Sequence, residues 1–304
     1  MKYLNWQNGL FLAALIAVVY ALLTIFEADR HIKDLNLGIA VLSALIYIAS
    51  ITIWNIAWGR YFSLPASESI KLGFASQLGG LTPLSLGADF LRGYYSKKAG
   101  RKFSAGMAAS LASKFHKILL ALVFSAIGIG LLIYQHSDLK GSLLLGAGIP
   151  IIMLAGVFFL TRNYSPWLIS NITLKRIGKE DTAEFSKTLR KFIYSPSKST
   201  ILLLFISLVF EFLAFLFAFS AFGVSLDFLN AYLVFVLLFF ASKAFFVPQG
   251  LGITELVGIF ILSGTIPASL IAAVLLLWNI VRIWIPIVIA GIATLSLGKE
   301  NAEK

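Results

Sequence analysis

Residues 83–93 read PLSLGADFLRG, and residues 248–258 read PQGLGITELVG. The two stretches share a proline, two leucines and two glycines at a fixed offset of 165 residues (248 − 83). Each copy also carries an acid, Asp89 in the first and Glu255 in the second. Proline removes a backbone donor and glycine permits turn conformations, so each stretch predicts a break in a helix.

The composition places these breaks in a membrane. The chain has 304 residues, of which 59% are hydrophobic and 13% charged, and its mean hydropathy of +0.90 is typical of a polytopic membrane protein. Backbone groups freed by a break cannot face lipid, so they must be buried in protein or line a wet cavity. Matched Gly/Pro breaks in the two halves of such a chain indicate a transport site, whereas two ordinary loops or kinks are the alternative.

Apolar runs predict the membrane spans. Seven runs have span length or nearly so: 10–26, 35–58, 105–134, 141–161, 201–222, 226–246 and 268–297. The first run could be a secretory signal, but it has no clear small-x-small cleavage site and more spans follow, so we expect a transmembrane helix. A kink at Pro286 or a strong tilt is expected in the last run, because it is long for one span.

The sequence therefore predicts an all-α polytopic integral membrane helix bundle with two broken or re-entrant helical elements and a possible internal repeat. We expect a single transmembrane domain over residues 1–304. The first broken element covers about 69–95 and the second about 247–265. A re-entrant hairpin and a broken full span both fit the first element.

Charge predicts the topology and the partners. The formal net charge of +11 lies mostly in short loops, with basic blocks at residues 92–104 and 162–199, so we expect both blocks on the cytoplasmic side of the cell membrane. This pattern points to membrane lipids with anionic headgroups as partners, and not to nucleic acid. With no cysteine, three histidines without metal-ligand spacing and no nucleotide-binding fingerprint, we expect no metal and no cofactor.

Residues 172–195 form a basic segment with helical periodicity. Asp181 is expected to begin a helix, with Glu184 three residues on as in a capping box. Apolar residues then recur on one face from Phe185 onward, which predicts an amphipathic helix. Such a helix could lie on the membrane surface or pack on the other cytoplasmic loops.

Several charged side chains lie within apolar runs, where a charge costs about 2.5–3.5 kcal/mol at a helix centre. They are Glu211, Lys243, Glu255 and Arg282. Such charges indicate function, although an internal ion pair that only fixes packing is the alternative. We expect Glu255 and Arg282 to face the same internal cavity, as a pair or through the substrate.

For other charged and aromatic residues, a role in topology or at the membrane interface is an alternative to function. Arg92 can bind a phosphate through two N–H groups or can simply be a topogenic charge. Lys114 and Lys117 are expected to be snorkelling residues near the interface. Trp54 and Trp58 are expected in an interfacial belt.

The candidate substrate-binding residues come from the two breaks and the last span. They are Pro83, Gly87, Asp89, Arg92, Pro248, Gly250, Gly252, Glu255 and Arg282.

Three patches together resemble one family. They are a Pro-x-x-x-Gly-x-Asp-x-x-Arg run (83–92), a Pro-x-Gly-Leu-Gly-x-x-Glu run (248–255) and a late Arg-x-x-x-Pro-x-x-x-x-Gly run (282–291). This pattern is similar to the lysylphosphatidylglycerol synthase transmembrane, or flippase-like, family of prokaryotes, over about residues 10–297. The family usually has an Arg, followed three residues on by an Asp, where this chain has Lys114 and Lys117, which puts an ion pair there in doubt.

The resemblance implies movement or handling of lipid. The leading hypothesis is a lipid translocase for an anionic phospholipid or a polyprenyl-phosphate-linked lipid. An integral-membrane transferase acting on a lipid-phosphate is one alternative, and a non-catalytic partner of a lipid-modifying enzyme or glycosyltransferase is another. The family's soluble aminoacyl-transferring domain is not found in these residues, so we do not expect this chain to make aminoacylated lipid.

Overall fold

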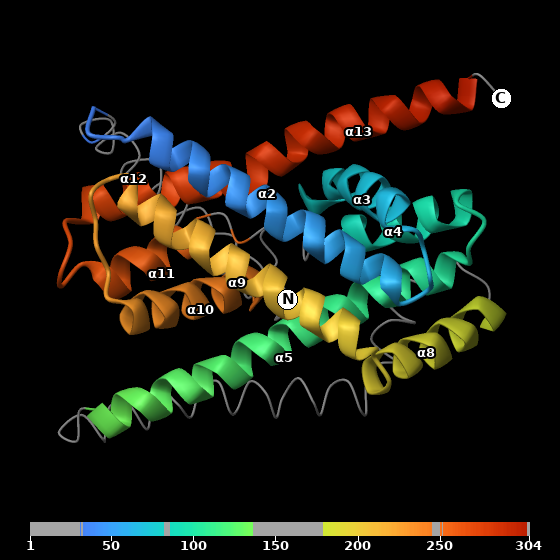
Figure 1. Cartoon of the computed structure of the whole chain (residues 1–304), viewed down its shortest axis with the longest axis horizontal. Coiled ribbons are helices and arrows are strands. Elements are labelled where there is room, and N and C mark those ends of the chain that lie inside the picture. Colours follow the sequence, from blue (N-terminus) through green and yellow to red (C-terminus); the bar gives the residue numbers. More distant parts are fainter. Residues whose placement is uncertain are drawn as a thin grey trace, which may run out of the picture. The chain divides into compact units, whose positions relative to one another are not determined.

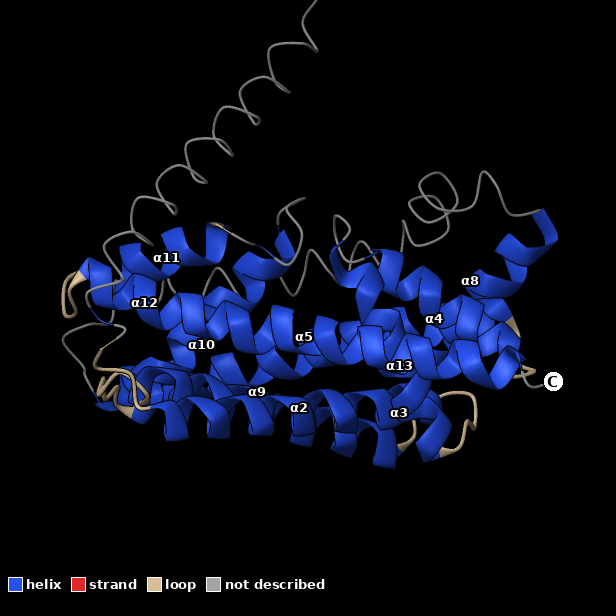
Figure 2. Ribbon diagram, turned by 90° about the horizontal axis from the view of Figure 1, so that it is seen from above, coloured by secondary structure: helices blue, strands red, loops and turns tan. Residues whose placement is uncertain are grey.

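The computed structural model describes residues 31, 33–81, 86–135, 179–244, 250 and 252–302. Figures 1 and 2 show that this part of the chain consists of helices joined by short loops, without a strand. The predicted all-α helix bundle is therefore confirmed. The elements are, in order, α2 (Leu37–Arg60), α3 (Ala66–Ala75), η1 (Ser76–Leu81), α4 (Leu86–Lys98), α5 (Phe103–Gln135), α8 (Lys179–Tyr194), α9 (Lys198–Ser220), α10 (Phe228–Ala244), α11 (Ile253–Leu262), α12 (Ala268–Asn279), η5 (Ile280–Trp284) and α13 (Ile285–Ala302).

Four helical segments of the described residues are long and apolar enough to cross a membrane. They are Leu37–Arg60, Phe103–Ile127, Lys198–Ser220 and Ala268–Leu297. These agree with four of the predicted spans, while the predicted spans 10–26 and 141–161 lie outside the described residues. Within the predicted span 226–246 the structure describes α10, which has 17 residues, and the residues that follow Ala244 lie outside the described part of the chain.

The last long segment changes helix type in the middle. Residues Ile280–Trp284 form a π-helical turn between α12 and α13, in which the N–H of Ile285 donates to the carbonyl of Ile280. Pro286 follows directly and has no N–H to donate. A π-helical turn before proline relieves the clash with the preceding turn, so the irregularity expected at Pro286 is present as a change of helix type.

The first broken element has three parts. The helix α3 tightens into the 3₁₀-helix η1, and α4 starts at Leu86, after residues 82–85, which include Pro83 and lie outside the described residues. η1 and α4 pack closely, because a Cβ on Gly79 would lie 2.2 Å from the carbonyl carbon of Gly87. The glycine at 79 is therefore needed for the backbones to approach.

The second broken element separates α10 from α11. Gly250 and Gly252 have φ angles of +70° and +81°, a region that L side chains rarely adopt. A Cβ on Gly250 would also lie 2.5 Å from Cα of Ser242. Pro248 lies outside the described residues. The glycines of the second stretch thus form the turn that the sequence predicted.

The chain divides into two compact units, which are described separately. Unit 1 combines the residues up to Ile48 with Glu211–Ile287, and unit 2 combines Ala49–Phe210 with the residues from Val288. In unit 1, α11 packs against both α10 and α12. Aromatic rings fill the interior of this unit, where Trp278 meets Phe215 edge to face with centroids 5.5 Å apart.

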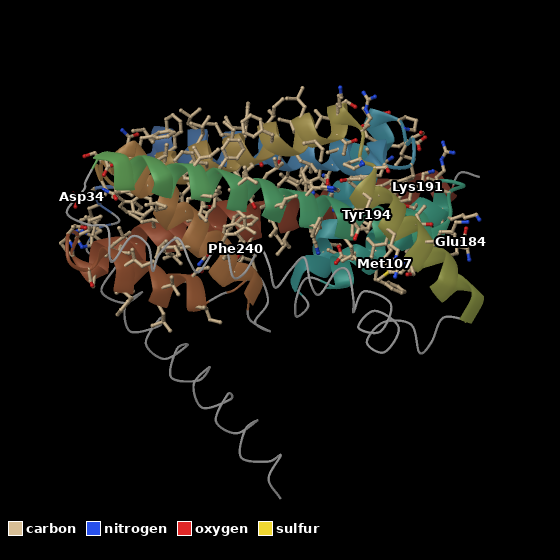
Figure 3. All side chains as sticks on the ribbon, turned by 90° about the horizontal axis from the view of Figure 1, so that it is seen from below. Asp34, Met107, Glu184, Lys191, Tyr194 and Phe240 are labelled. Atoms are coloured by element: carbon tan, nitrogen blue, oxygen red, sulfur yellow. The ribbon has the colours of Figure 1, made fainter. Side chains whose placement is uncertain are left out.

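In unit 2, α8 packs on α5 and closes a core around α3, α4 and the end of α2. Its apolar face is buried, because Phe185, Leu189 and Phe192 join Met107 of α5 in one cluster. Figure 3 labels Met107 together with Glu184, Lys191 and Tyr194 of α8. Of the two predicted placements, packing on other helices is therefore the one observed. The helix begins at Lys179 and not at Asp181, and Glu184 pairs with Lys102.

The ion pair between Lys102 and Glu184 also bears on the membrane topology. Lys102 belongs to the first basic block and Glu184 to the described part of the second, 179–199. The two blocks therefore lie against each other within unit 2, as required if both face the same side of the membrane.

The order of elements repeats along the chain. Adding the offset of 165 to Phe103, the first residue of α5, gives Ala268, the first residue of α12. The same offset carries α4 onto α11 to within two residues at its start, and places α3 within α10. The five identities noted in the sequence thus extend to a repeated succession of helices.

Candidate functional site

Both acids of the repeated stretch lie in the first turn of a short helix. Asp89 is in the first turn of α4 and Glu255 in the first turn of α11. The positive end of a helix dipole favours an acid at this place. One turn further on, the matched glycines let the next helix approach: a Cβ on Gly93 would meet the ring of Phe103 at 2.9 Å, and one on Gly258 would meet Leu275 at 2.5 Å. Each acid is therefore held close to the helix that follows.

In unit 2, the Asp89 cluster consists of Asp89, Arg92, Ser110 and Lys114. Asp89 is fully buried; its Oδ2 lies 2.7 Å from the ammonium nitrogen of Lys114, and its Oδ1 accepts a hydrogen bond of 2.6 Å from Ser110. The prediction that Lys114 snorkels at the interface is wrong, because it pairs with a buried carboxylate. The departure from the family pattern at 114 therefore keeps an ion pair, with Asp89 as the acid.

Arg92 belongs to the same cluster and is 1% exposed. Its guanidinium donates to Ser76 at 3.2 Å, to Ser110 at 3.0 Å and to Asn55 at 2.8 Å. Ser110 therefore joins Arg92 to Asp89, since it accepts from one and donates to the other. A phosphate that reached Arg92 would have to displace one of these partners or bind the remaining N–H groups.

Two tryptophans complete the surroundings of Arg92. Its guanidinium carbon lies 4.1 Å from the ring centroid of Trp54 and 5.3 Å from that of Trp58. Trp58 is fully buried and donates its indole N–H to the carbonyl of Gly106. The predicted interfacial belt is therefore wrong for Trp58, which lies in the interior of unit 2, and Trp54 forms a cation–π contact with Arg92.

Lys117 is also buried, with 9% of its surface exposed. Its ammonium group donates to Ser207 at 3.2 Å and lies 5.5 Å from the ring centroid of Trp54. Snorkelling was therefore the wrong expectation for this lysine too. One turn away from Lys114 on α5, Lys117 thus adds a buried cation to a helix that also carries the partly exposed Lys114.

In unit 1, the Glu255 cluster consists of Thr254, Glu255, Asn279 and Arg282. Glu255 is 8% exposed, and its two oxygens accept hydrogen bonds from the amide of Asn279 and, at 3.0 Å, from the hydroxyl of Thr254. Arg282 donates to Asn279 at 3.0 Å and to Thr254 at 3.1 Å. Asn279 and Thr254 therefore link the carboxylate to the guanidinium, and the structure brings together the two charges expected to face each other.

Other groups of unit 1 surround this cluster. The hydroxyl of Thr254 lies 3.2 Å from the carbonyl oxygen of Gly250, so the glycine turn contacts the cluster directly. Glu211 of α9 and Tyr47 of α2 contribute to the electrostatic environment of Arg282. The side chain of Lys243 lies outside the described residues.

The two clusters occupy equivalent places in the repeat. At the offset of 165, Lys114 of α5 corresponds to Asn279 and Lys117 corresponds to Arg282. In both copies the residue at the first of these positions contacts the acid of the preceding short helix. The chemical difference between the copies is that a lysine faces Asp89, whereas an asparagine faces Glu255.

Sequence reasoning missed the neutral hydrogen-bond partners of the charged residues in both clusters, which include Asn55, Ser76, Ser110, Thr254 and Asn279. Serine and threonine are common in membrane helices, so their presence carried no signal. The sequence did carry a signal for Asn279, because it is a polar side chain three residues before Arg282 in an otherwise apolar run.

Among the described residues, no group of three or more His, Asp or Glu side chains lies close enough to hold a metal ion.

The family model of the lysylphosphatidylglycerol synthase transmembrane region matches residues 8–290, which is nearly the whole chain. No curated protein matches the chain significantly.

Proposed function

Because the chain belongs to the lysylphosphatidylglycerol synthase transmembrane family, and is thus a membrane protein linked to lipid handling, we propose that it is a lipid translocase. Its substrate is a lipid with an anionic, phosphate-bearing headgroup, either a phospholipid or a polyprenyl-phosphate-linked lipid. It acts in the cell membrane, where the headgroup crosses along protein and the acyl chains remain in lipid.

The observation that carries this proposal is the Glu255 cluster. A buried carboxylate follows directly on a break in an apolar segment, and neutral side chains link it to a half-buried arginine of η5. Charges inside a membrane are costly and mark substrate pathways or ion relays. An arginine offers a planar fork of N–H groups that matches phosphate oxygens, so Arg282 is the residue that we assign to the headgroup.

The first copy supports the same function in a different way. The Asp89 cluster satisfies its own charges, with Lys114 against Asp89 and Arg92 among serine, asparagine and tryptophan side chains. Removal of one partner from such a buried network costs several kcal/mol. The Asp89 cluster is therefore suited to hold the first broken element in shape. We therefore assign headgroup contact to the second copy and rigid support to the first.

Reconstitution tests the proposal. Purified protein is placed in liposomes with phosphatidylglycerol that is labelled on an acyl chain with a fluorophore, and a membrane-impermeant reductant then quenches the label in the outer leaflet. We expect the protein to extend quenching beyond the outer-leaflet share. Extraction and chromatography of the same lipids would reveal a modified product if the chain were instead a transferase.

Two variants make the test specific. Arg282→Gln is expected to lower the rate of exchange about tenfold or more, since a hydrogen bond to a charged group contributes about 1.5–3 kcal/mol. Arg190→Gln is the matched control, because Arg190 is exposed on α8, and it is expected to exchange lipid like the wild type. Equal quenching in protein-containing and protein-free liposomes would refute the proposal.

A further inference from the structure

The two copies of the repeat treat their buried acids differently. Asp89 has an ammonium group 2.7 Å from one oxygen, supplied by Lys114. Glu255 is contacted at the equivalent place by the neutral amide of Asn279. Among the described side chains, its other hydrogen-bond partner, Thr254, is neutral as well. Asp89 is thus in direct contact with an ammonium group, whereas Glu255 is linked to the Arg282 guanidinium through the neutral side chains of Asn279 and Thr254.

The contacts of Glu255 accommodate both protonation states. When the carboxylate is charged, the hydroxyl of Thr254 donates to Oε2 at 3.0 Å. When it is protonated, its O–H can donate to the Thr254 oxygen, and Thr254 can turn its own hydrogen to the carbonyl of Gly250, 3.2 Å away. The same oxygen can still accept from Arg282, because a hydroxyl has two acceptor positions. Neither state leaves a buried polar group of Thr254 or Glu255 without a partner.

The proton changes the charge that Arg282 presents. With Glu255 ionised, the pair has no net charge, and with Glu255 protonated it has a net charge of +1. Among the described residues, the other titratable groups that act on Arg282 are Glu211 of α9 and Tyr47 of α2. An anionic headgroup therefore meets a more attractive site when the proton is bound.

We propose that Glu255 is a proton carrier and that this protein moves a proton together with the anionic lipid headgroup. The inference rests on the translocase function proposed above. On one side of the membrane the Glu255 carboxylate takes up one proton and Arg282 takes up one headgroup monoanion. On the other side both are released. The step moves no net charge, no covalent bond to lipid forms, and a pH gradient drives it.

The test uses the reconstituted protein with labelled phosphatidylglycerol, at equal pH on both sides and with an imposed pH gradient. A pH-sensitive dye trapped inside the liposomes records proton movement. For the wild type we expect lipid movement to change with pH by up to about tenfold per pH unit for one proton. We also expect dye-reported proton uptake that depends on the addition of anionic lipid.

Variants separate Glu255 from the rest of the chain. Glu255→Gln should remove both the pH dependence and the lipid-dependent proton uptake. Asn279→Lys, which copies Lys114 of the first repeat, should hold Glu255 in its charged form and slow lipid movement at every pH. Glu184→Gln, an exchange of the same kind on the half-buried surface of α8, should behave like the wild type.

The two proposals fail in different ways. If the wild type moves no lipid under any condition, the translocase function itself is refuted. If it moves lipid at a rate that is independent of pH and without proton uptake, proton coupling is refuted while the translocase function stands. The wild-type measurements decide this even if a variant does not fold.

Discussion

Removal of Lys114 should strand a buried acid. Asp89 has a side chain that is 1% exposed, and Lys114, 23% exposed, is its charged partner at 2.7 Å. In Lys114→Met the methionine fills much of the same volume, but Asp89 keeps only the hydrogen bond from Ser110. Loss of one partner from a buried ion pair costs about 3–5 kcal/mol. Because Lys114 is partly exposed, we expect the lower end, about 3 kcal/mol.

Thermal unfolding in detergent, followed by tryptophan fluorescence, measures this effect. A loss of about 3 kcal/mol should lower the Tm by roughly 5 °C for a protein of this size. The double variant Asp89→Asn with Lys114→Met should recover much of the loss, since no unpaired charge is then buried. A single variant as stable as the wild type, or a double variant no better than the single one, would refute this account of the Asp89 cluster.

A matched control is available in the same unit. Lys102 also pairs with an acid, Glu184, but these side chains are 71% and 41% exposed. Exposed ion pairs contribute about 0–1 kcal/mol, so Lys102→Met should shift the Tm far less than Lys114→Met.

Two further predictions concern the second turn and the topology. Gly250→Ala should lower stability by at least about 1–2 kcal/mol, because φ is +70° and the new Cβ would lie 2.5 Å from Cα of Ser242, and thermal unfolding again measures it. Cysteines introduced singly at Lys98 and Lys187 should react with an impermeant thiol reagent from the same side of the membrane, since the chain has no cysteine of its own and the two basic blocks adjoin.

A defined result would contradict each of these two predictions. Gly264→Ala is the control for the turn, because a Cβ there meets nothing within 4 Å and its φ is not positive. Equal stability of the Gly250 and Gly264 variants would contradict the need for glycine at 250. Opposite labelling of the two cysteines would overturn the topology.

The sequence by itself determined the fold class and the breaks. Apolar runs of span length leave few alternatives to membrane helices, because backbone groups must be satisfied internally in lipid. Glycines 250 and 252 were recognisable as turn residues for a local reason, since a positive φ depends on the residue's own missing Cβ. Charges within apolar runs were equally visible, because their cost does not depend on knowing their partners.

The tertiary structure decided which groups those charges meet. Lys114 and Lys117 were expected near the interface. Only the packing of α5 on α4 and its neighbours shows Lys114 against the buried Asp89 and Lys117 buried near Trp54. The tertiary structure also decided where the apolar face of α8 lies, because an amphipathic helix has the same periodicity whether that face contacts lipid or another helix. The structure also shows that Lys114 contacts Asp89 and that Asn279 contacts Glu255. The sequence did not predict these contacts, because hydrogen-bond partners distant in sequence are set by helix packing and not by local pattern.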